Sequence, residues 1–140
     1  MIRRICVIDG QGGGIGATLI KTLKAEFGES VELIALGTNA IATAQMLKAG
    51  ANKGASCQNA ICRTVTSADC IMGAIAVTWA NAMSGELTSN MAEAVMNSSA
   101  LKILLPLSQD KVEIVGLNKE PLPHLVAAAI EKVKEMMKNV

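Results

Sequence analysis

The chemistry in this sequence is concentrated in one glycine-rich segment, which reads Asp-Gly-Gln-Gly-Gly-Gly-Ile-Gly from Asp9 to Gly16. An apolar run precedes the segment and a helical pattern follows it. Glycine loses more conformational entropy on folding than any other residue, so such a cluster indicates that missing side chains have a use. A strand-to-helix turn of this kind leaves the first N–H groups of the helix facing open space, where the helix dipole favours an anion. The segment therefore predicts a site for a phosphate or another negatively charged group.

Two registers of this segment resemble dinucleotide-binding turns. Gly12, Gly14 and Ala17 match the pattern G-x-G-x-x-[G/A], which places a pyrophosphate at the start of a helix. Gly10, Gly14 and Gly16 are similar to the G-x-x-x-G-I-G turn of short-chain dehydrogenases. A nucleotide, NAD(P) included, is therefore a candidate ligand. The other interpretation is a tight turn that packs a helix against a strand and binds nothing.

Other parts of the sequence depart from a complete nicotinamide site. The second expected strand ends in Gly37-Thr38-Asn39, with no acidic residue for a ribose and no arginine for a 2′-phosphate. The chain contains no tyrosine, so the Tyr-x-x-x-Lys pair of short-chain dehydrogenases is excluded. No Gly-Lys-Ser/Thr follows the turn, which excludes a P-loop. The identity of the cofactor or ligand is thus left open.

Several polar residues near the turn have two interpretations each. A carboxylate at Asp9 would repel an anion unless it bound a sugar hydroxyl, a metal or a proton, so we favour capping of nearby N–H groups. Thr38 and Asn39 are favoured as helix caps, although one residue can also contact a ligand. Glu86 fits either a site residue or a solvated helix end, and we favour the solvated helix end. The expected binding site comprises ten residues: Asp9, Gly10, Gln11, Gly12, Gly13, Gly14, Ile15, Gly16, Thr38 and Asn39.

The four cysteines do not indicate a metal site. Cys57 and Cys62 are separated by four residues and have no second pair at metal-ligand spacing, so we expect no bound metal. Cys6 and Cys70 lie in apolar strand patterns and are expected in the core, where free cysteine behaves as a small hydrophobe.

Composition restricts the classes of partner. Hydrophobic residues make up 51% of the 140 residues and charged residues 18%, which is typical of a sheet covered on both faces and also favours a homo-oligomer. The net charge is +1, and Phe27 and Trp79 are the only aromatic residues, so we expect no nucleic-acid binding. The apolar stretches are too short to cross a membrane, and the chain begins with a strand pattern instead of a signal peptide. We therefore expect a cytoplasmic protein.

The glycine segment must be positioned by alternating strands and helices. Strands are expected at residues 2–9, 31–36, 53–56, 70–75, 102–107 and 112–117. Helices are expected at residues 15–27, 40–49 and 58–65, as a helix or helical turn through 79–83, and at 89–97 and after Pro121. This alternation predicts one Rossmann-like three-layer α/β/α domain over residues 1–140, with a mostly parallel sheet of five or six strands. The polar connection at 108–111 is too short for a crossover, so the last strand is expected to be antiparallel.

The carboxyl ends of the expected strands bring further residues to the edge where ligands collect in such sheets. They are Asp9, Thr38 and Asn39, residues 56–59, Gly73, Ala74 and Ser108. Gly73 and Ala74 fit either the close passage of a cofactor or ordinary packing. No base, nucleophile and metal set converges on one cleft, so catalytic residues are not assigned.

The run from Asp9 to Gly16 resembles the hallmark of a bacterial domain-of-unknown-function family of similar length. The likeness extends through residues 37–43, 85–88 and 121–124. The resemblance implies a cytoplasmic bacterial protein and names no activity.

The leading hypothesis for function is a domain that binds a nucleotide or another phosphate-bearing molecule through residues 10–16. A small enzyme, with Asp9, Asn39 or Cys57 as candidates for chemistry, is the first alternative. A structural or regulatory subunit without a ligand is the second.

Overall fold

The computed structural model describes residues 2–138 and contains a five-stranded, all-parallel sheet. The strand order is β3-β2-β1-β4-β5, and each adjacent pair is parallel. The strands are β1 (Arg4–Asp9), β2 (Glu32–Gly37), β3 (Lys53–Ser56), β4 (Cys70–Ala74) and β5 (Leu101–Leu105). The expected α/β class with a mostly parallel sheet is confirmed.

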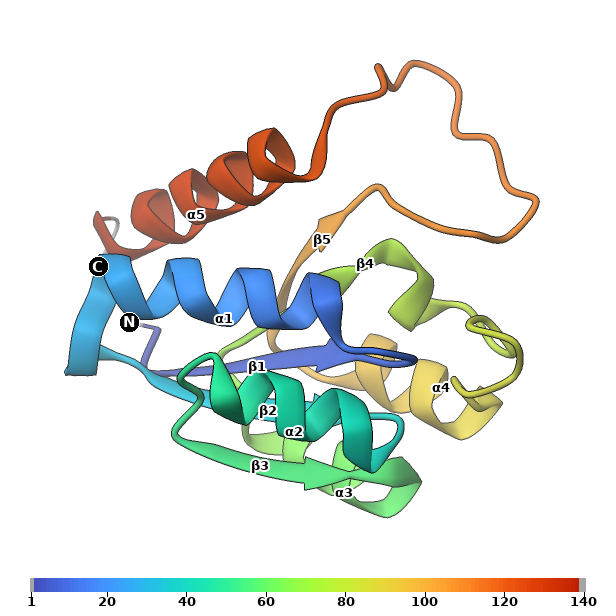
Figure 1. Ribbon diagram of the computed structural model, residues 1–140, viewed down its shortest axis with the longest axis horizontal. Helices are drawn as coiled ribbons and strands as arrows, with labels where there is room; N and C mark the ends of the chain where they lie inside the picture. Colours follow the sequence, from blue (N-terminus) through green and yellow to red (C-terminus); the bar gives the residue numbers. More distant parts are fainter. Residues whose placement is uncertain (1, 139–140) are drawn as a thin grey trace.

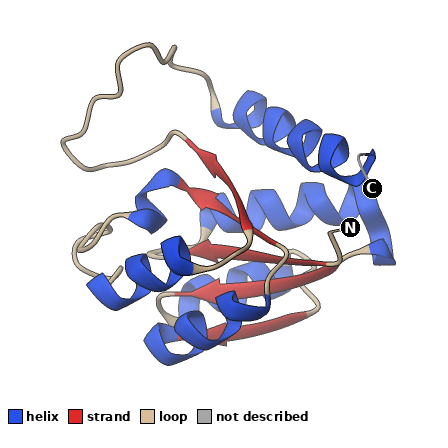
Figure 2. Cartoon of the chain, turned by 180° about the vertical axis from the view of Figure 1, so that it is seen from behind, coloured by secondary structure: helices blue, strands red, loops and turns tan. Residues whose placement is uncertain are grey.

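Helices cover both faces of the sheet, which gives the expected three layers (Figures 1 and 2). One face carries α1 (Gly14–Phe27), α2 (Ala40–Lys48) and α5 (Leu122–Lys138). The other face carries α3 (Cys57–Thr64) and α4 (Ser89–Asn97). Three short 3-10 helices complete the elements: η1 (Gly28–Ser30), η2 (Val65–Ser67) and η3 (Ile75–Thr78). The helix or helical turn expected through residues 79–83 is a series of turns instead.

The core follows from the period of two along β1. Ile5 and Val7 pack with α1 and α5, whereas Cys6 and Ile8 pack with α3 and α4. Both faces of this central strand are fully covered, which explains why its sequence is apolar without interruption. Cys6 and Cys70 are buried as expected, and burial raises the pKa of each thiol to about 12.

The predicted antiparallel strand at residues 112–117 is wrong. These residues belong to an exposed connection between β5 and α5, residues 106–121, which we call the arm (Figure 1). Val115 is 99% exposed. Ser108 and Asp110 hydrogen-bond each other locally at the start of the arm. From there the chain crosses to α5, which packs on β5 and α1, so it does not return along the sheet edge.

Two expectations about partners concern the surface. None of the described helices combines the length and apolar character needed to cross a bilayer. The homo-oligomer stays a prediction. Exposed apolar side chains such as Ile41 on α2 and Met96 on α4, which are 67% and 55% accessible, are consistent with it.

Candidate ligand-binding site

The sheet has a topological switch point between β1 and β4. The chain moves from β1 through β2 to β3 on one side of β1, and then returns to place β4 and β5 on the other side. Because the connections leave such neighbouring strands in opposite directions, a crevice opens at their carboxyl ends. A cavity of about 250 Å³, which we call the inner hollow, lies there. Its lining includes Asp9 at the end of β1, Ala74 at the end of β4, and Gln11 and Ile15 of the glycine segment.

Asp9 caps the glycine turn. Its side chain is 7% exposed and accepts hydrogen bonds from the N–H groups of Gly10 and Gly16, at 2.7 and 2.6 Å. Burial raises the pKa of this carboxyl, while the two N–H donors act in the opposite direction. The favoured interpretation of Asp9 as a cap is therefore confirmed, and two of the turn's N–H groups are occupied by the protein itself.

Glu86 contacts the glycine turn, so the favoured interpretation of this residue as part of a solvated helix end is wrong. One of its carboxylate oxygens, Oε1, accepts hydrogen bonds from the Gln11 N–H, the Thr38 hydroxyl and the Asn39 amide, at 2.8, 2.7 and 2.8 Å. Asn39 also caps α2 by accepting from the Ala42 N–H. The predicted polar residues Thr38 and Asn39 thus meet at the turn, but they hold Glu86.

A strained loop delivers Glu86 to this position. The non-glycine residues Asn81, Met83 and Ser84 all have positive φ, and Gly85 follows with φ 90°. Left-handed conformations at non-glycine residues are unfavourable and persist where the surroundings enforce them. No local pattern in the sequence predicts these positive φ angles, although the Ser84-Gly85 pair marks a break in helical structure.

Removing the charge of Glu86 should destabilise the fold in a pH-dependent way. The donors on Glu86 hold the pKa of its carboxyl below the ordinary value of 4.5, so the stability that it contributes is present above that value and is lost as pH falls through the folded-state pKa. In urea unfolding at pH 7 we expect Glu86→Gln to lose about 1 kcal/mol, the difference between charged and neutral acceptors. The deficit should shrink toward pH 3.

A matched control for this substitution is Glu93→Gln on α4. Glu93 is exposed and none of the described hydrogen bonds or ion pairs uses its carboxylate. A deficit in Glu86→Gln that is the same at pH 3 and pH 7, or that Glu93→Gln reproduces, would contradict the charged contact at the turn.

The five glycines of the turn divide into two groups. A Cβ at Gly10, Gly13 or Gly16 would lie within 3 Å of another residue, so packing alone explains these three. A Cβ at Gly12 or Gly14 would meet nothing within 4 Å, and neither residue has a positive φ. The described fold therefore gives no internal reason for glycine at positions 12 and 14.

The same part of the turn carries the N–H groups that remain available. Within residues 2–138, no hydrogen bond uses the N–H of Gly12, Gly14 or Ile15. Gly12 lies just before α1, and Gly14 and Ile15 are the first two residues of that helix, where the positive end of the helix dipole lies. The turn thus offers three free donors beside two glycines with open space above them.

The remaining residues expected at this edge separate into those that line a hollow and those that do not. Ala74 and Ser108 line the inner hollow. Gly73 does not, and its Cβ would lie 2.6 Å from the Ile8 carbonyl oxygen, so packing of β4 against β1 explains it. Cys57 is exposed at the start of α3 and does not line the inner hollow. Within the described chain, no three His, Cys, Asp or Glu side chains come together to hold a metal ion.

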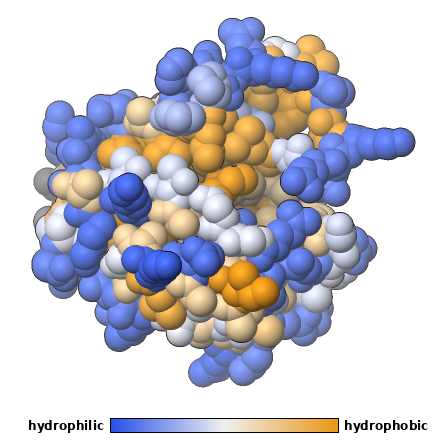
Figure 3. All heavy atoms as spheres, in the orientation of Figure 1, coloured by the Kyte–Doolittle hydropathy of each residue, from blue (hydrophilic) through white to orange (hydrophobic). Residues whose placement is uncertain are grey.

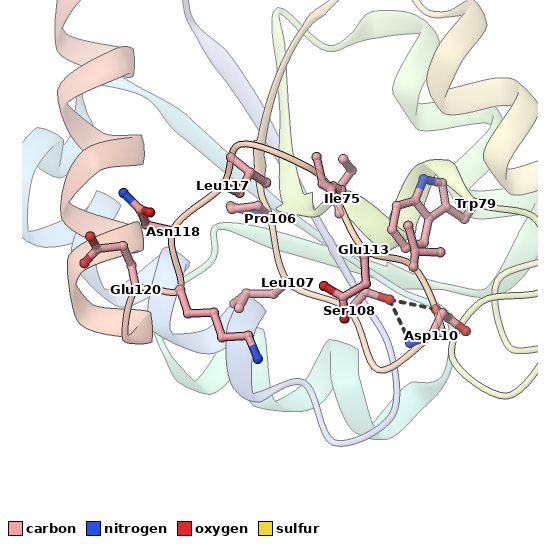
Figure 4. Close-up of a pocket in the computed structure, with 13 residues that line it drawn as sticks. Ile75, Trp79, Pro106, Leu107, Ser108, Asp110, Glu113, Leu117, Asn118 and Glu120 are labelled. Atoms are coloured by element: carbon pink, nitrogen blue, oxygen red, sulfur yellow. Dashed lines mark hydrogen bonds between the residues drawn. The ribbon is translucent and has the colours of Figure 1, made fainter.

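A second cavity, the outer hollow, lies beneath the arm and has a volume of about 390 Å³. It is lined by Ile75, Trp79 and eleven residues of the arm between 106 and 120. Figure 3 shows that the surface between α1 and the arm is hollowed and largely apolar. Figure 4 shows Trp79 at one side of the outer hollow, near Asp110 and Glu113, with Asn118 and Glu120 at the opposite side.

Comparisons with known proteins give a match to a family model and a loose match to a solved structure. A family model described as "Domain of unknown function (DUF3842)" matches residues 4–138. No curated protein matches the chain. Among solved structures, the chain is similar to one described as "Crystal structure of universal stress protein in complex with cAMP", at 17% sequence identity and a TM-score of 0.40. That match covers 74% of this chain and 97% of the other, and at this TM-score it supports no inference about a ligand.

Proposed function

This chain belongs to the DUF3842 family of domains of unknown function, and from the geometry of its switch-point site we propose that it binds a small phosphate-bearing molecule. The phosphate accepts hydrogen bonds from the free N–H groups of Gly12, Gly14 and Ile15. The rest of the ligand occupies the inner hollow. The bacterial and cytoplasmic origin expected from the resemblance stays a prediction.

The observation that carries this proposal is the pair Gly12 and Gly14. Glycine costs stability in a turn and at the start of a helix, and nothing in the described packing or backbone angles requires it at these two positions. Close approach of a ligand to the backbone explains both. It also explains why the adjacent N–H groups have no partner within the protein, since donors at a helix start are suited to an anion.

The carboxylate of Asp9 does not prevent phosphate binding at this turn. Both of its oxygens already accept hydrogen bonds from N–H groups of the turn, so these donors compensate part of its negative charge. Because Asp9 and Glu86 complement part of the turn, contacts of the non-phosphate part of the ligand must contribute a large share of the affinity.

A thermal-shift panel tests the proposal directly. The panel pairs phosphate-bearing compounds (nucleoside monophosphates, NAD(P) and sugar phosphates) with their dephosphorylated counterparts. A ligand at 100 times its Kd adds about 2.7 kcal/mol to the free energy of unfolding, which raises Tm by several degrees. We expect at least one phosphate compound to do so while its counterpart does not. If no phosphate compound stabilises the protein more than its counterpart, the proposal fails and the subunit alternative is favoured.

A further inference from the structure

We propose that the outer hollow receives the heteroaromatic base of a mononucleotide, stacked against Trp79, while the phosphate of the same ligand lies on the glycine turn. This inference rests on the proposed function, because it takes the turn as the phosphate site. It adds the chemical class of the ligand and the place of its second half.

The two hollows are neighbours and can hold one ligand. Leu107, Ser108 and Asp110 line both of them. The inner hollow reaches the glycine turn at Gln11 and Ile15, and the outer hollow reaches Trp79. A ligand whose phosphate lies at the turn can therefore extend through the inner hollow to the indole. The volumes of about 250 and 390 Å³ together fall in the range of small-molecule sites.

The lining of the outer hollow fits a base and does not fit a phosphate. Three carboxylates, those of Asp110, Glu113 and Glu120, line it together with one ammonium group, that of Lys119. This excess of negative charge repels an anion. The carboxylate oxygens can accept hydrogen bonds from the ring and exocyclic N–H groups of a purine. Trp79 provides an aromatic surface of the kind on which bases stack.

The opposite side of the turn, above β2, is filled. In dinucleotide-binding folds the adenosine lies on that side, against the end of the second strand. Here Glu86 occupies the donors of Gln11, Thr38 and Asn39. The sulfur of Met83 also packs directly on Gly10, 2.7 Å from the position of a Cβ there. A ligand must therefore run from the turn toward β4 and the arm, which favours a mononucleotide over a dinucleotide.

Trp79 makes the inference measurable because it is the only tryptophan of the chain. AMP, GMP and ribose 5-phosphate are titrated into the full chain, with intrinsic fluorescence corrected for absorption by the base and with Tm measured in parallel. Ribose 5-phosphate keeps the sugar and the phosphate and lacks the base. We expect AMP or GMP to change the fluorescence of Trp79 and to raise Tm more than ribose 5-phosphate, which should leave the fluorescence unchanged.

Substitutions place the base. Trp79→Ala should raise the Kd of the nucleotide about 5- to 150-fold, the range for loss of one stacked base, with no change in the Kd of ribose 5-phosphate. Trp79→Phe should retain most of the affinity. Since Trp79 also packs against buried residues of the α4 face, Glu113→Gln on the exposed arm gives a second test. Glu113→Gln should raise the Kd of the nucleotide and leave the Kd of ribose 5-phosphate unchanged, whereas Glu93→Gln should change neither Kd.

The outcomes separate the two proposals. If ribose 5-phosphate and the nucleotides raise Tm equally, and neither the fluorescence nor Glu113→Gln responds, phosphate binding stands and the base site is overturned. If none of the three compounds raises Tm, both are overturned for this class of ligand. A fluorescence change whose midpoint Glu113→Gln leaves unaltered also overturns the base site. So does an unchanged Kd of the nucleotide in Trp79→Ala, which is measured by isothermal titration because this variant has no tryptophan.

Discussion

Gly14→Val should remove most of the phosphate-dependent stabilisation while leaving the fold at least as stable as the wild type. Gly14 is the first residue of α1, its φ is not positive, and a side chain there meets no described atom within 4 Å. Valine is a better helix former than glycine by a few tenths of a kcal/mol, so the unliganded protein gains slightly. The valine methyl groups cover the N–H groups of Gly14 and Ile15, which are the donors that the phosphate needs.

The expected loss is at least 100-fold in Kd. At a concentration that gives the wild type about 2.7 kcal/mol of stabilisation, the variant should then retain about 0.4 kcal/mol. Isothermal titration and thermal shift with the best compound of the panel measure both quantities. Ala25→Val is the matched control, because Ala25 is exposed on the same helix, far along the chain from the turn. Equal ligand affinity in Gly14→Val and Ala25→Val would show that the phosphate does not bind here.

Gly13→Ala, unlike Gly14→Val, should lower the free energy of unfolding. Gly13 has φ 75°, and a Cβ there would lie 2.8 Å from Cα and 2.9 Å from the carbonyl oxygen of Ala42 in the first turn of α2. The left-handed backbone costs about 1–2 kcal/mol for a residue with a side chain. Backbone atoms of a packed helix cannot move aside cheaply, so overpacking adds about 1–3 kcal/mol.

The sum is a loss of about 3 kcal/mol, which corresponds to a fall in Tm of roughly 10 °C in a chain of this size. Urea unfolding of Gly13→Ala beside Gly12→Ala measures it. Gly12 has neither a positive φ nor a neighbour within 4 Å, so its alanine variant should lie within about 0.5 kcal/mol of the wild type. Two variants of equal stability would mean that α2 does not pack on the turn as described.

The order of strands and helices was predictable because each element has its own local hydrophobic pattern. Buried parallel strands such as β1 are continuous apolar runs, and α1 keeps its apolar residues on one stripe. Residues 112–117 have the same local character, yet they lie in the arm. Whether such a run joins the sheet depends on the element that follows it. Here that element is α5, which packs on the face of the sheet that carries α1.

The candidate site was predictable in place but not in detail. The sequence located the turn, but it could not divide its glycines into those fixed by packing and those facing open space. The atoms that decide this come from Ala42, Met46, Thr38 and Met83, which approach only in the folded chain. Glu86 was missed for the same reason, since its partners lie 47 to 75 residues away.

Two thiols are buried in the middle of the sheet, so their reactivity toward an alkylating reagent reports whether the protein is folded. Cys6 pairs in register with Ile71, and Cys70 with Ile5, on adjacent central strands. An alkylating reagent can reach them only when these strands separate, whereas Cys57 is exposed in the native state. After a brief pulse of the reagent, adducts on Cys6 and Cys70, located by mass spectrometry, therefore report the molecules whose sheet has opened, whereas Cys57 reacts without opening.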